Sequence, residues 1–271
     1  MEVDEYCYGH GLTRAGFIGR GAIVGGALLT GSAALAGAAK ADDGDDGHRH
    51  VPSPFEVPNT PLARAVSDFA ASTYPPFLAN HCQRSYDLAT LIAAAGNVSV
   101  DLEVLYAAIL LHDLGLVSQF HSSSARFEVA SASAARSFAR DHGLSPQRAE
   151  QVWDVVVLHG TGGIAAYKSV ETLTAADGIG RDVTGLDLDE FPKDVVDRVM
   201  ATRPGFAKPF IDAIVADLQD KPQVANSTWM MQIAEAHIPS FHPVSVETLA
   251  FNDPYEQARE PCGRFERLAK R

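Results

Sequence analysis

The sequence has few cysteines and no excess of positive charge. The first shortage argues against a cysteine metal site, and the second argues against a nucleic-acid-binding protein. Its 271 residues include only three cysteines, Cys7, Cys82 and Cys262, whose spacing matches no metal site. A Cys82–Cys262 disulfide and two unpaired thiols both stay open. Lys and Arg number 22 against 34 Asp and Glu, which gives a net charge of −12 with no basic stripe. An acidic surface repels phosphate backbones, so we do not expect a nucleic acid partner.

The sequence also lacks the period-two alternation of half-buried strands, and it shows no internal repeat. The one strand candidate is the valine-rich stretch 152–158, and the capping residues around it favour a helix. From Thr60 onward, apolar residues recur at helical spacing between N-cap residues, prolines at first helical positions and terminal glycines. The sequence therefore predicts one all-α domain over residues 60–243, followed by a C-terminal extension at 244–271.

The first 59 residues differ from this helical pattern. Residues 1–41 have a basic start, an apolar middle rich in Gly and Ala, and small residues before the end at Ala41. This order predicts a removed export signal, hence a periplasmic or extracellular protein without stable membrane insertion; an uncleaved anchor is the alternative. Thr13–Ile18 resembles a twin-arginine signal, except that Ala15 stands where the second arginine belongs. Residues 42–59, rich in Asp, Gly, His and Pro, are predicted to form a linker.

The stretch LLHDLGL, residues 110–116, places a histidine and an aspartate side by side at the end of an apolar helix. The helix dipole can explain His112 but not Asp113, because a carboxylate opposes the dipole at that end. Adjacent helical residues point about 100° apart, so both can reach one ion only beside the helix end, where Gly115 relaxes the geometry. Imidazole and carboxylate together suit divalent ions such as Zn²⁺, Fe²⁺ or Mn²⁺.

The arrangement of His81, His112–Asp113 and Asp177 resembles the metal-binding pattern of the HD-domain superfamily of all-α, metal-dependent hydrolases. Five stretches also resemble, in order, segments of its cyanamide hydratase-like branch: NHCQRSYDLA, LLHDLGL, RFEVASASAARSF, VWDVVVLHG and GRDVTGLDLDEFP. The resemblance covers most of residues 74–239. It implies one divalent metal held by these four residues, with Zn²⁺ expected first and Fe²⁺ or Mn²⁺ as alternatives.

The last metal ligand has two candidates in the segment ADGIGRDVTG. The superfamily's Ala-Asp ligand corresponds best to Asp177, whereas the branch's Asp-Val-x-Gly motif corresponds to Asp182. We prefer Asp177 as the ligand and assign Asp182, His159, Arg84 and Glu128 to catalysis or substrate binding. Each of these assignments has a structural alternative. His159 could instead interact with the dipole at the C-terminal end of its helix. Arg84 and Glu128 could instead form ordinary ion pairs.

The resemblance implies an enzyme that adds metal-activated water to a small C–N substrate of the nitrile or cyanamide type. A first alternative keeps the fold but acts as a phosphohydrolase on a nucleotide or phosphoester, with Arg84, Lys168 and Arg181 as candidate phosphate ligands. A second alternative is an inactive HD-type binding or sensor module, which would need a broken ligand set. The expected partner is a small-molecule substrate.

Overall fold

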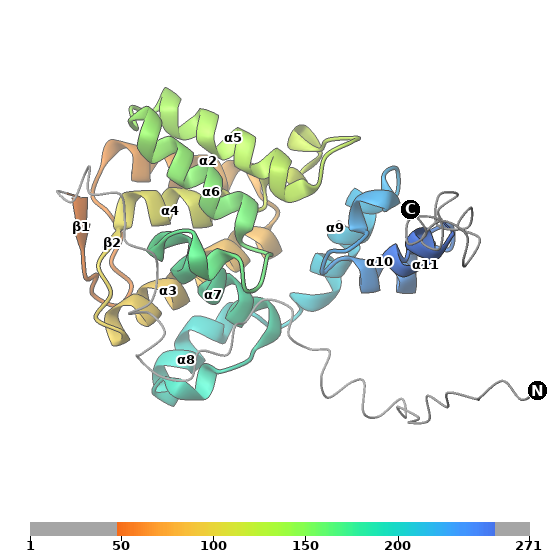
Figure 1. Ribbon diagram of the computed structural model, residues 1–271. Coiled ribbons are helices and arrows are strands. Elements are labelled where there is room, and N and C mark those ends of the chain that lie inside the picture. Colours follow the sequence, from red (N-terminus) through yellow and green to blue (C-terminus); the bar gives the residue numbers. More distant parts are fainter. Residues whose placement is uncertain (1–47, 253–271) are drawn as a thin grey trace, which may run out of the picture.

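The computed structural model describes residues 48–252, and the regular secondary structure of this part of the chain is almost entirely helical (Figure 1). The predicted all-α architecture is confirmed for these residues. The predicted export signal and Cys262 lie outside them. Within residues 48–252, no helix combines the length and the apolar character that crossing a bilayer requires. The helices are α2 (Pro61–Thr73), α3 (Pro76–Ala95), α4 (Leu102–Leu111), α5 (Phe127–Asp141), α6 (Pro146–Leu158), α7 (Val170–Thr184), α8 (Lys193–Val199), α9 (Ala207–Leu218), α10 (Met231–His237) and α11 (Val246–Phe251).

Side-chain caps and prolines begin the helices where the sequence predicts them. The hydroxyl of Thr60 accepts a hydrogen bond from the backbone N–H of Ala63 at 3.1 Å, and Pro61 occupies the first helical position of α2. Ser145 caps α6 in the same way, directly before Pro146. These caps satisfy backbone donors that the first turn leaves free. The valine-rich stretch lies inside α6, as its caps indicate.

The segment from Arg49 onward packs on the helical domain, although the sequence predicts residues 42–59 as a linker. Strand β1 (Arg49–His50) pairs antiparallel with β2 (Val100–Asp101), just before α4. The guanidinium of Arg49 also lies 3.0 Å from the buried carboxylate of Glu171 on α7. The segment also makes apolar contacts, because Pro52 is buried and Phe55 packs against the cluster of Leu88, Leu91 and Val199. Its polar composition does not indicate these contacts, because their partners are distant in the sequence.

Helix α4 lies at the centre of the fold. All of its residues except Glu103 are buried, and it packs against α2, α3, α5, α6 and α7 (Figure 1). A helix that is apolar all round is expected to be enclosed by other elements. Because α4 crosses the core, its C-terminal end delivers His112 and Asp113 to a fully buried position.

The C-terminal helices α9 and α10 extend the same core. Phe210 and Ile214 of α9 are buried in the main apolar cluster, together with Met230 just before α10. Phe241 is the last buried residue among those described, and the side chains from 242 to 252 are exposed. Two aromatic residues of this C-terminal part reach the candidate site described next.

Candidate metal centre

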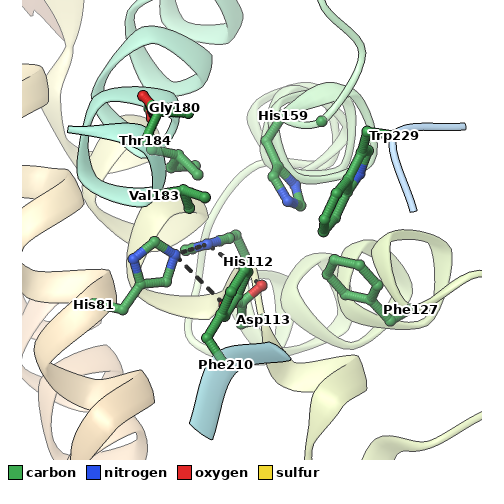
Figure 2. Close-up of a pocket in the computed structure, with 12 residues that line it drawn as sticks. His81, His112, Asp113, Phe127, His159, Gly180, Val183, Thr184, Phe210 and Trp229 are labelled. Atoms are coloured by element: carbon green, nitrogen blue, oxygen red, sulfur yellow. Dashed lines mark hydrogen bonds and ion pairs between the residues drawn. The ribbon is translucent and has the colours of Figure 1, made fainter. Parts of the chain in front are cut away.

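Three side chains of the kinds that bind metals lie close together at the end of α4 (Figure 2). They are His81 from α3, His112 and Asp113, all essentially buried. The Nε2 atoms of the two histidines lie 3.2 Å apart. The Asp113 carboxylate oxygens lie 3.4 Å from Nε2 of His112 and 3.6 Å from Nε2 of His81.

Adjacent ligands meet here because the helix ends between them. His112 closes α4 with φ −68° and ψ −22°, whereas Asp113 leaves the helical region with φ −106° and ψ 14°. A short 3₁₀ turn, Leu114–Leu116, follows. Gly115 has a packing role in this turn, because a Cβ there would lie 2.3 Å from the backbone carbonyl oxygen of Phe127. The predicted change of direction at the helix end therefore falls at Asp113 itself.

Hydrogen bonds on the far side of each imidazole fix its tautomer. Nδ1–H of His81 donates to Asp182 at 2.6 Å, and Nδ1–H of His112 donates to the carbonyl of Ile109 at 2.7 Å. In the neutral rings this leaves both Nε2 lone pairs directed into the site. Burial, followed by the neighbouring His159 and His81, holds the pKa of His112 well below its ordinary value. Two facing lone pairs repel each other unless a cation lies between them.

Asp113 supplies an anionic donor to the same point. Its Oδ2 is one of the few buried side-chain oxygens in residues 48–252 without a hydrogen-bond partner. Burial raises the pKa of Asp113, since a carboxylate without donors is costly in an apolar interior. Bonds of about 2.0–2.1 Å to a zinc ion would hold neighbouring donors about 3.0–3.4 Å apart. The separations of 3.2 and 3.4 Å lie in this range and that of 3.6 Å lies just above it, so the group suits one divalent ion such as Zn²⁺, Fe²⁺ or Mn²⁺.

Asp177, the preferred fourth ligand, is not among the three residues that group here. Its carboxylate is partly exposed and pairs with Arg181 one turn later at 3.0 Å. Asp182 is the α7 carboxylate that reaches the site, where it accepts the hydrogen bond from His81. Five residues on a helix correspond to about 140° of rotation, so the two carboxylates face different sides of α7.

Arg84 acts on the site through Asp182. Its Nε and Nη2 donate to the two Asp182 oxygens at 2.6 and 2.9 Å, and the side chain is 2% exposed. Burial works to raise the pKa of Asp182, but the hydrogen bonds from His81 and Arg84 outweigh it, and the pKa lies below its usual value. Asp182 is therefore an ionised acceptor that orients His81 from behind.

A cavity of about 60 Å³ adjoins the three ligands (Figure 2). His159, at the end of α6, lies across it from His112, with ring centroids 4.9 Å apart. Its Nδ1–H donates to the carbonyl of Val156 at 2.6 Å, so its Nε2 is unprotonated in the neutral ring. Among the described residues that line the cavity, none is a lysine or an arginine. The other walls are Phe127, Gly160, Ile179, Gly180, Val183, Thr184, Phe210 and Trp229.

The aromatic walls are the part of the site that the sequence did not indicate. Phe210 and Trp229 follow His81 by more than a hundred residues, and each belongs to a helical pattern that predicts core packing. Glu128 lies beside the cavity lining, ion-paired with Arg126 and hydrogen-bonded to the Trp229 indole at 3.2 Å. Glu128 therefore contacts one wall of the cavity, and its role near the substrate stays a prediction.

Comparison with protein families supports the class that the ligands indicate. Residues 78–199 match the HD domain family, a superfamily of metal-dependent hydrolases. This match includes His81, His112, Asp113 and Asp182 and ends before Phe210 and Trp229. A search of curated proteins gave no match. Residues 78–199 are therefore similar to an HD domain, and they include a group of residues suited to a divalent metal.

Proposed function

We propose that the protein is a metal-dependent hydratase or hydrolase that adds water to a small C–N substrate of the nitrile or cyanamide type. The supporting observation is a cavity of only about 60 Å³, mostly apolar, directly beside His81, His112 and Asp113. Sites for drug-sized ligands usually measure roughly 300–1,000 Å³. A cavity this small suits a substrate of a few atoms better than a nucleotide.

The chain's own residues provide orientation, proton transfer and exclusion of water. A bound divalent ion would lower the pKa of its water toward about 7, so that hydroxide is accessible near neutral pH. Asp182 and the Ile109 carbonyl hold His81 and His112 with their Nε2 atoms toward each other, so that the two atoms could both bind a metal ion. The apolar walls keep bulk water away, which strengthens electrostatic interactions inside the cavity.

His159 and Asp113 are the groups placed to move protons. The unprotonated Nε2 of His159 can take a proton from the attacking water and return it to nitrogen. The free Oδ2 of Asp113 is a second acceptor in the same cavity. In the reaction a C–O bond forms, one C–N π bond breaks, and the nitrogen receives the proton lost by water. Tautomerisation of this adduct gives an amide, with no other reactant required.

The phosphohydrolase alternative lacks cations at the cavity. Its three candidate phosphate ligands are each occupied elsewhere: Arg84 by Asp182, Lys168 by Asp154 at 2.9 Å, and Arg181 by Asp177. None of the three lines the cavity. The sensor alternative would need a broken ligand set, whereas His81, His112 and Asp113 are all present and close together.

Elemental analysis of the purified protein, followed by assays on cyanamide and p-nitrophenyl phosphate, tests this proposal. We expect one divalent ion per chain and turnover of cyanamide. His112→Ala should lose both metal and turnover. His142→Ala is a matched control, because His142 also ends a helix with Nδ1 bonded to a backbone carbonyl, but it is exposed. Turnover of p-nitrophenyl phosphate alone would overturn the proposal, and absence of bound metal would favour the sensor module.

A further inference from the structure

Trp229 forms a cavity wall that does not belong to the matched HD domain. It lies just before α10, in the part of the chain that follows residue 199, and its ring faces the cavity opposite Val183 and Thr184 (Figure 2). Trp229 packs edge-on against Phe127, with ring centroids 6.2 Å apart and planes at 90°. The limit of the cavity on this side is thus an indole contributed by the turn that precedes α10.

Two contacts fix the position of this indole. Its Nε1–H donates to Oε1 of Glu128 at 3.2 Å, and Glu128 is 1% exposed and ion-paired with Arg126. At Gly160, a Cβ would lie 2.6 Å from the indole Nε1 and 3.5 Å from the Glu128 carboxylate. The indole therefore occupies the space that any larger residue at position 160 would need.

We propose that Trp229 is a specificity-determining residue that sets the upper size of the substrate, and that Glu128 is the positioning residue that holds its ring. This inference rests on the proposed function for the identity of the substrate. The permitted substrate is a nitrile-type group with no bulky substituent, and the rejected ones carry a ring. Replacing the indole by a methyl group would open a space comparable to the cavities of about 150 Å³ that bind benzene in other protein cores.

The test compares Trp229→Ala with the wild type and with Trp153→Ala, which truncates the other tryptophan of the chain, outside the cavity. Benzonitrile binding to the metal-loaded proteins is measured by calorimetry, and turnover is measured on cyanamide and benzonitrile. We expect Trp229→Ala alone to gain benzonitrile binding and to shift the kcat/KM ratio toward benzonitrile by about tenfold or more. If Trp229→Ala does not fold, Trp229→Leu should show the same change to a smaller extent.

A folded, metal-loaded Trp229 variant with unchanged binding and an unchanged ratio would overturn the size limit. The calorimetric measurement of benzonitrile binding requires no turnover, so it tests the size limit independently of the proposed hydratase function. If the Trp229→Ala variant gains benzonitrile binding but the wild type does not turn over cyanamide, the proposed function is rejected, whereas the size-limiting role of Trp229 is supported.

The role of Glu128 is tested by fluorescence in a Trp153→Phe background, where Trp229 is the sole tryptophan. Glu128→Leu should change the Trp229 emission maximum and relax the size limit, because the indole loses its acceptor. Glu128→Gln keeps a carbonyl acceptor and should restore both properties. If Glu128→Leu lowers stability but leaves emission and substrate ratio unchanged, Glu128 does not position the indole.

Discussion

Replacing Asp182 by asparagine should weaken metal binding, although Asp182 is not one of the three candidate ligands. The substitution keeps the shape of the side chain but removes the charge that accepts hydrogen bonds from His81 at 2.6 Å and from Arg84 at 2.6 and 2.9 Å. An amide N–H turned toward His81 would favour the tautomer with the proton on Nε2, which blocks that lone pair. Arg84 would at the same time remain buried without its counter-charge.

Two effects of this substitution can be estimated. Loss of a partner that orients a metal-binding histidine typically lowers metal affinity by about 10–100-fold. Because folding and metal binding are linked, this lowers the metal-dependent stabilisation by about 1.4–2.7 kcal/mol at saturating metal. Breaking a buried ion pair by removing one partner costs about a further 3–5 kcal/mol without metal. Asp182→Asn should therefore be destabilised in the metal-free state and show a smaller gain when metal is added.

Metal affinity is measured by competition with a chromogenic chelator, and stability by urea denaturation with and without metal. Asp177→Asn is the matched control: it is the same substitution on the same helix, at a partly exposed ion pair worth about 0–1 kcal/mol. We expect its metal affinity to equal that of the wild type. Reduced affinity in Asp177→Asn together with normal affinity in Asp182→Asn would refute the reasoning and restore Asp177 as the ligand.

Three further predictions concern stability. Chelation of the metal should lower the thermal midpoint in calorimetry, because a ligand at a hundredfold excess over its Kd contributes about 2.7 kcal/mol; an unchanged midpoint would indicate that no metal binds the folded state. Gly115→Ala should destabilise the protein by about 1–3 kcal/mol in urea, because its Cβ would lie 2.3 Å from the Phe127 carbonyl oxygen; wild-type stability would contradict that packing. Lys221→Met should cost about 3–5 kcal/mol at neutral pH, because it removes the ammonium 2.8 Å from the buried carboxylate of Asp217. Burial already raises the pKa of Asp217, so this cost should shrink below about pH 4, where the carboxyl is protonated in both states; a cost independent of pH would point to lost packing instead.

Patterns among neighbouring residues were sufficient to predict the helices and the His112–Asp113 pair at the centre of the site. Caps such as Thr60 and Ser145 act within one turn, so they can be read from neighbouring residues. The pair His112–Asp113 is adjacent in the chain and sits at a helix end, so its joint direction follows from local geometry. The same reasoning failed for the segment at Arg49, whose partners on β2 and α7 are distant in the sequence.

The sequence by itself thus determined an all-α chain in which imidazole and carboxylate groups occur at a helix end. Only the tertiary structure decided which α7 carboxylate meets His81, because Asp177 and Asp182 differ by about 140° of helix rotation and the packing of α7 on α3 selects one face. It also decided the size of the cavity, since Phe210 and Trp229 reach it through helix packing that no local periodicity specifies. Periodicity fixes which face of a helix is apolar, whereas contact between distant helices depends on how all of those faces pack together.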